Sequence, residues 1–215
     1  MKKILVIFVA LMALATSGCN SQSVIKSPEG IGEAVTNLIK TGGTMDYADF
    51  AQFFVNVEDC NKLSAKSTDT DLKNDFQETA KRLNAGNHYE GYDNFKGIFP
   101  FLKENGYDLS NLTFVDFWYE EAVVNGISCL FGLVIMKSND KYLIADPTAV
   151  KTNNGYKLTR LEKKTFNWCS DVTEVREDGN ICGDFGPEEP ECINFKDMIK
   201  GLKEGGGISI KMMVR

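Results

Sequence analysis

Few side chains in this chain could carry out acid–base chemistry. The 215 residues contain one histidine, His88, in a Gly-Asn-His-Tyr stretch that reads as a loop between helices. A lone histidine in a loop is more often a surface residue than a base. Asp116 and Glu120 lie on one face of an expected strand, beside Trp118, and could act as an acid–base pair only if burial shifted their pKa values. A half-solvated outer face explains these carboxylates more simply.

The sequence motifs for metal and phosphate binding are absent or incomplete. The usual zinc spacings are absent, and the glycine run at residues 205–207 lacks the Lys-Ser/Thr that follows a phosphate loop. One acidic stretch partly matches a calcium loop, with ligand positions 1, 3, 7 and 12 filled by Asp178, Asn180, Asp184 and Glu189. Position 5 of that loop is Cys182, which is a poor calcium ligand. No metal and no cofactor is therefore predicted.

The N-terminus has the three parts of an export signal. A basic start precedes an apolar run over residues 4–15, which is too short to span a bilayer, and three small residues then precede Cys19. Small residues ending at a cysteine resemble the lipobox of bacterial lipoproteins, although Thr16 stands where that pattern usually has Leu. The resemblance implies cleavage before Cys19 and acylation of Cys19, and Asn20 in place of Asp implies the outer membrane. The alternative is an ordinary secretory leader with a chance cysteine.

Composition limits the possible partners. The formal net charge is −6, and removal of Lys2 and Lys3 with the leader takes it to about −8. An acidic chain does not favour a nucleic-acid partner, which would require a basic face. The apolar fraction of 43%, with 14 Phe, is sufficient for a folded core.

Helical spacing of apolar residues predicts helices in the first half of the chain. The first begins with Ser27 as its N-cap and Pro28 in its first turn. Pro100 falls inside the last helix and should kink or split it. The predicted helices cover about residues 27–42, 46–55, 70–84 and 92–105.

Residues 112–165 have the alternation of an antiparallel meander of three or four strands. The strand at 127–137 is apolar on both faces, so it is covered on both sides or lies at a subunit interface, which leaves a homodimer open. The first strand is predicted to place Val115, Phe117 and Tyr119 on one face and Phe114, Asp116, Trp118 and Glu120 on the other. The residues between Cys169 and Cys192 read as an acidic loop, followed by a short helix from Phe195 and a last strand at 208–214.

The order of these elements resembles the nuclear-transport-factor-2-like superfamily. The resemblance rests on Ser-Pro-Glu opening a helix, on the stretch GGTMDYADFAQFF, and on a meander that closes on NNGYKLTRLE. It implies an α+β fold in which N-terminal helices pack on a curved antiparallel sheet, forming a cone with an apolar pocket. The superfamily includes enzymes, binding proteins and scaffolds, so the fold alone does not give the function.

Five aromatic residues are the candidates for lining such a pocket, because their periodicity places them on faces that should converge between helices and sheet. They would bind a small apolar ligand. The alternative is that the rings fill the core, as buried Phe does by default. These residues are Phe54, Phe99, Phe117, Tyr119 and Phe131.

Export would place the cysteines of the mature chain in an oxidising compartment. Besides Cys19 there are five, an odd number, so at least one stays free. Cys129, in the middle of a strand, is the candidate for a buried free thiol. A bridge between Cys182 and Cys192 would close the acidic loop, but the sequence does not fix the pairing. The five are Cys60, Cys129, Cys169, Cys182 and Cys192.

The chain therefore divides into a signal peptide (1–18), a lipidated tether (19–26), an α+β cone-like domain (27–166) and an acidic extension (167–215). The predicted function is that of a lipoprotein held in the cell envelope, on the periplasmic face of the outer membrane, through acylated Cys19. Its domain is expected to bind a small apolar ligand or an envelope protein without catalysis. The alternatives are a pocket enzyme with isomerase- or dehydratase-like acid–base chemistry, in which Asp116 or a neighbour acts, and a dimeric scaffold of the envelope.

Overall fold

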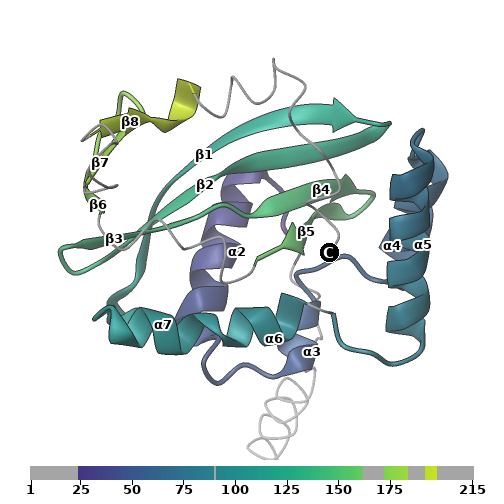
Figure 1. The fold of residues 1–215 in the computed structure, drawn as a ribbon, viewed down its shortest axis with the longest axis horizontal. Coiled ribbons are helices and arrows are strands. Elements are labelled where there is room, and N and C mark those ends of the chain that lie inside the picture. Colours follow the sequence, from purple (N-terminus) through teal and green to yellow (C-terminus); the bar gives the residue numbers. More distant parts are fainter. Residues whose placement is uncertain (1–23, 90, 162–171, 184–191, 198–215) are drawn as a thin grey trace, which may run out of the picture.

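The computed structural model describes residues 24–89, 91–161, 172–183 and 192–197. Helices come first along this part of the chain, and two antiparallel sheets follow. Figure 1 shows the larger sheet crossed by helix α2, with helices α4 and α5 standing side by side at one end of the strands. The α+β class predicted from the sequence is confirmed at this level.

Helix α2 (Pro28–Thr41) begins where the sequence predicts it. The Ser27 hydroxyl accepts a hydrogen bond from the Gly30 amide at 3.2 Å, and Pro28 occupies the first turn, where a missing N–H costs nothing. Ile31, Val35, Leu38 and Ile39 are buried along one side of the helix. This apolar stripe packs α2 against strands β1 (Thr113–Val124) and β2 (Ile127–Ser138).

The second predicted helix is much shorter than expected, and the helix after it was not predicted. Helix α3 covers only Tyr47–Ala51, because the chain then extends alongside strand β5 (Gly155–Arg160), with the Leu158 amide donating to the Phe53 carbonyl at 2.9 Å. Asn56 and Asp59 next form a reciprocal capping box that starts helix α4 (Val57–Lys66). Helix α5 (Thr70–Asn84) lies where it was predicted.

The last predicted helix is split, but the break is not at Pro100. Helix α6 (Gly91–Lys96) ends before Gly97, which is the N-cap of helix α7 (Ile98–Glu104). Pro100 lies in the first turn of α7, where its missing N–H has no helical acceptor to lose. A short 3-10 turn, η1 (Leu109–Asn111), leads into the sheet.

Within the described residues the larger sheet has five antiparallel strands, where the sequence predicted three or four. Strand β2 pairs with β1 on one side, while β3 and β4 pair in succession with the two halves of its other side. Asp146 and Pro147 separate β3 from β4, and Pro147 has no amide to continue the ladder. The strands are β1 (Thr113–Val124), β2 (Ile127–Ser138), β3 (Lys141–Ala145), β4 (Thr148–Thr152) and β5 (Gly155–Arg160).

A bulge in β1 changes the predicted faces of that strand. The pairing of β1 with β2 shifts by one residue between Phe114 and Asp116. As a result Phe114 packs against Gly32 of α2, on the same side as Phe117, whereas Val115 is 48% exposed. The prediction that Phe114 shares a face with Asp116 and Trp118 was wrong, because an inserted residue reverses the alternation on one side of it.

The described part of the acidic region, predicted as a loop, forms a second sheet of three strands. Its strands are β6 (Val172–Val175), β7 (Asn180–Gly183) and β8 (Cys192–Asn194), in the order β6-β7-β8. This sheet lies beside β3 (Figure 1), and the Lys196 ammonium lies 4.8 Å from the centre of the Trp118 ring. The predicted strand at 208–214, and the predicted helix beyond Asp197, lie outside the described residues.

Candidate functional site

Two of the five predicted pocket residues belong to an aromatic cluster between the small helices. Phe54 is 1% exposed, and its ring stacks on that of Phe50 at a centroid distance of 4.3 Å. The Phe99 ring meets that of Phe95 edge-on at 5.2 Å, and Phe95 in turn lies 4.9 Å from Phe50. Phe54 and Phe99 are therefore linked through rings that are themselves fully buried.

The other three residues lie elsewhere on the sheet. The rings of Phe117 and Tyr119 stack at 5.2 Å on the side of the sheet that α2 covers. Phe131 pairs directly with Glu120, one residue out of step with Tyr119, so it projects from the opposite face. Phe99 packs near Gly42, at the other end of α2 from the Glu29 that Tyr119 contacts, about 20 Å away along the helix. The structure does not bring the five rings together.

Two phenol–carboxylate pairs join α2 and β5 to strand β1. The Tyr119 hydroxyl donates to Glu29 at 3.1 Å, and the Tyr156 hydroxyl donates to Glu121 at 2.8 Å. Burial, followed by the hydrogen bond to Glu121, raises the pKa of Tyr156 to about 12. The pKa of Tyr119 is raised by the same two effects, with Glu29 as its acceptor. Because both phenols stay protonated at neutral pH, they act as donors that hold the elements together.

A surface hollow lies between helices α4 and α5. Its volume is about 310 Å³, at the lower end of the range for small-ligand sites. Val57 and Ala80 provide its apolar part. Asn61, Gln77, Lys81 and Asn84 supply three amides and one ammonium group, all exposed.

None of these four polar side chains donates or accepts a hydrogen bond within the described part of the chain. Their donors and acceptors are therefore available to a ligand. This site was not predicted from the sequence, because it depends on α4, which was not predicted either.

A buried lysine was also missed. Lys157 of β5 is 7% exposed, its ammonium donates to the Gln52 carbonyl, and its pKa is lowered by burial, while nearby Asp59 acts in the opposite direction. Asp59 is itself 6% exposed and accepts a hydrogen bond from the Asn56 amide. Lys157 therefore ties β5 to the segment that leads into α4. The alternation of β5 did not signal this burial, because it places Lys157 on the face opposite Tyr156 and Leu158, where a lysine is ordinarily exposed.

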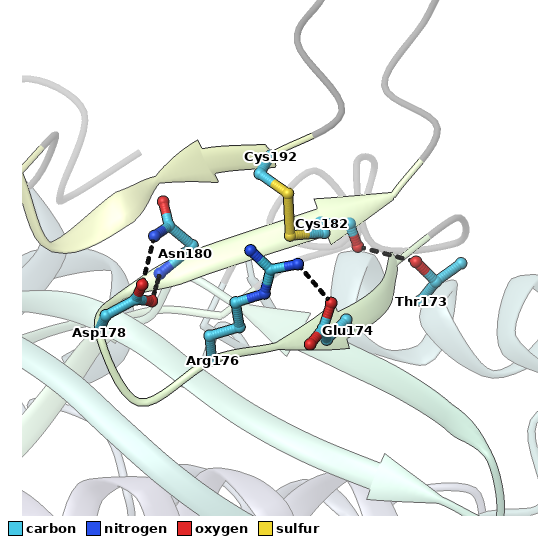
Figure 2. Close-up of a disulfide and its surroundings, with 7 residues drawn as sticks. All are labelled: Thr173, Glu174, Arg176, Asp178, Asn180, Cys182 and Cys192. Atoms are coloured by element: carbon cyan, nitrogen blue, oxygen red, sulfur yellow. Dashed lines mark hydrogen bonds and ion pairs between the residues drawn. A yellow bond between two sulfur atoms is a disulfide. The ribbon is translucent and has the colours of Figure 1, made fainter.

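The predicted disulfide between Cys182 and Cys192 is present and joins directly paired positions of β7 and β8. Figure 2 shows it bridging β7 and β8, with the β6–β7 turn at the left, where the Asp178 carboxylate accepts hydrogen bonds from the backbone and side chain of Asn180. Asp178 and Asn180 thus form a turn, while Asp184 and Glu189 of the partial calcium pattern lie outside the described residues. Among the described residues, no group of three or more His, Cys, Asp or Glu side chains could hold a metal ion.

Cys129 is a buried free thiol, as predicted, and Cys60 is a second one. Burial raises the pKa of each thiol to about 12. Both therefore stay protonated and poorly nucleophilic at neutral pH. Cys169 lies outside the described residues.

The acid–base candidates have structural roles. The Asp116 carboxylate accepts hydrogen bonds from the Trp118 indole at 2.7 Å and from the Phe117 amide at 2.8 Å. The exposed His88 ring stacks on Tyr47 at 4.0 Å.

Comparison with known proteins adds no assignment. No protein-family model matches the chain, and no curated protein or solved structure matches it. In the part of the chain that the structure describes, no helix is long and apolar enough to cross a membrane. The resemblances to lipoproteins and to the nuclear-transport-factor-2-like superfamily, with its cone-shaped sheet, stay predictions.

Proposed function

We propose that this protein is a lipid-anchored protein of the cell envelope whose folded domain is a non-catalytic binding module. The anchor is acylated Cys19, and the periplasmic face of the outer membrane is its location. The proposal is supported by the three-part leader and by the short distance along the chain from Cys19 to Ile25, the residue that pairs with Tyr156 of β5. The domain begins within a few residues of the membrane anchor.

The observation that carries the binding role is the hollow between α4 and α5, with its four available polar side chains. Three amides can each donate and accept hydrogen bonds, and Lys81 adds a positive charge. Such a lining suits a small polar ligand that bears an anionic group, or a polar acidic segment of an envelope protein. It is less suited to the apolar ligand that the five aromatic residues were expected to bind.

A dimeric scaffold is the second candidate, and it is supported by the long edge strand β1. Its twelve residues form one edge of the five-stranded sheet among the described residues. Pairing of two such edges would join two copies of the chain.

Two measurements test the proposal. Intact-mass analysis of membrane-extracted protein should show an N-terminus at Cys19 that carries acyl chains. A soluble form cleaved elsewhere, with unmodified Cys19, would refute the anchor.

For the binding role, amide side-chain NMR signals of Asn61, Gln77 and Asn84 should shift when small acidic sugars and short acidic peptides are titrated in. Gln77→Ala should weaken this binding at least several-fold. Asn74→Ala, at an exposed position of α5 outside the hollow, is the matched control. Equal effects of the two substitutions, or shifts confined to β1 on self-association, would refute the hollow as the site.

A further inference from the structure

The short segment between Cys19 and the folded domain restricts how the domain can lie on a membrane. Ile25 is held in place: its carbonyl accepts a hydrogen bond from the Tyr156 amide at 2.7 Å, and its side chain is 5% exposed. Five residue steps separate Cys19 from Val24. Fully extended, they span at most about 18 Å. The surface around Ile25 is therefore confined near the membrane if Cys19 is acylated.

Strand register shows what this surface contains. Ile25 pairs with Tyr156, Tyr156 with Lys151, and Val123 with Ser128 near the same end of the sheet. These positions adjoin two strand turns, at residues 125–126 and 153–154. The first turn also touches the α4–α5 turn, since the Thr68 amide donates to the Asn125 carbonyl at 2.9 Å. All three turns lie at the end of the strands where β1 passes into β2 (Figure 1).

The exposed side chains of this surface, which we call the tether end, suit an interface between water and lipid. Val24 is 41% exposed and Val123 is 72% exposed, and they are two of the three large apolar side chains that are most exposed in the described residues. Lys26, Lys66 and Lys151 are exposed beside them.

Of the carboxylates nearby, Glu29 and Glu121 each accept a hydrogen bond from a tyrosine, and Asp69 in the α4–α5 turn accepts one from the Leu72 amide. On an acidic chain, a surface where lysines accompany the carboxylates is repelled less by an anionic membrane than a surface of carboxylates alone.

We propose that the tether end, defined by Val24, Lys26, Lys66, Val123 and Lys151, lies against the bilayer surface and fixes the orientation of the domain. The inference rests on the proposed acylation of Cys19. Strand β2 then leads away from the membrane, and its twelve residues place the β2–β3 turn about 40 Å along the strand from the tether end. Lys141 and Lys103 mark that far end, where the Lys141 ammonium donates to the Asn105 carbonyl at 2.7 Å.

Lysine labelling of the full-length acylated protein tests this orientation. The protein is reconstituted in phosphatidylethanolamine–phosphatidylglycerol vesicles and treated with a water-soluble amine reagent, before and after the vesicles are dissolved in detergent. Lys66 and Lys151 should be labelled several-fold more slowly in vesicles, while Lys103 and Lys141 should be labelled at similar rates in both states. The inference would be overturned if all four lysines were labelled at the same rate in vesicles as in detergent, or if Lys103 and Lys141 were the ones labelled more slowly in vesicles.

The intact mass of the same sample separates this inference from the proposed anchor. If Cys19 carries acyl chains and the protein sediments with vesicles but no lysine is protected, the anchor stands and the orientation is wrong. If Cys19 is unmodified, both are wrong. Inserting ten Gly and Ser residues after Asn20 should abolish the protection without loss of sedimentation, and unchanged protection would overturn the argument from tether length.

Discussion

Replacing Phe117 by alanine distinguishes a filled core from an open aromatic pocket. Phe117 is 5% exposed, and a Cβ added to Gly132 would lie 2.9 Å from its ring, so the ring covers a glycine that has no side chain to fill the space left behind. Phe→Ala at a site that cannot collapse costs about 3–5 kcal/mol. About 0.5–1.5 kcal/mol of that comes from the stacking on Tyr119.

Urea unfolding followed by tryptophan fluorescence measures this loss, and for a domain of this size it also lowers Tm by about 6–20 °C. Phe131→Ala is the matched control, because Phe131 is only partly buried and lies on the other face of the sheet. It should cost about 1–2 kcal/mol. If Phe117→Ala costs no more than Phe131→Ala and alters the binding of a hydrophobic dye, the rings line a pocket and the core assignment is wrong.

A mature chain that begins at Ser23 should unfold cooperatively. A chain that begins at Ser27 loses the Ile25–Tyr156 hydrogen bond and the burial of Ile25, so its free energy of unfolding in urea should be about 2–4 kcal/mol lower. Equal stabilities of the two chains would show that the Ile25 contact contributes nothing. Because the pKa of Tyr156 is raised from 10.0 to about 12, its contribution to stability is complete below pH 10 and is lost as the pH rises through 12. Tyr156→Phe should therefore flatten the fall of Tm between pH 10 and 12, and an unchanged slope would refute this role of the Tyr156–Glu121 hydrogen bond.

Local signals in the sequence were sufficient for the elements whose ends are capped by their own residues. Ser27 and Pro28 predicted the start of α2, and the alternation of residues 127–137 predicted β2. The disulfide candidates Cys182 and Cys192 also proved correct, since they are paired across β7 and β8. In each of these cases the residues that decide the structure are close together in the chain.

Errors arose where a distant strand decides the local structure. Phe53 and Phe54 continue the apolar pattern of α3, but the chain there is extended because it pairs with the edge of β5 at Leu158. With that extension α4 became a separate helix, and the hollow that depends on α4 could not be predicted. The bulge at Val115 caused a separate error in β1, because a single inserted residue places Phe114 on the face of Phe117.

The hollow belongs to both helices of the α4–α5 pair, so a ligand that occupies it binds only while the two helices are packed together. The pair is tied to the sheet at a few points, among them the Thr68–Asn125 hydrogen bond and Lys157. Openings of such a unit need not unfold the sheet. A ligand at 100 times its Kd would stabilise the paired state by about 2.7 kcal/mol, and hydrogen exchange of the α4 and α5 amides would slow by about 100-fold where it proceeds through that opening. Exchange within β2 would not change by that route. A ligand that slowed β2 and left α5 unaffected would have to bind elsewhere on the domain.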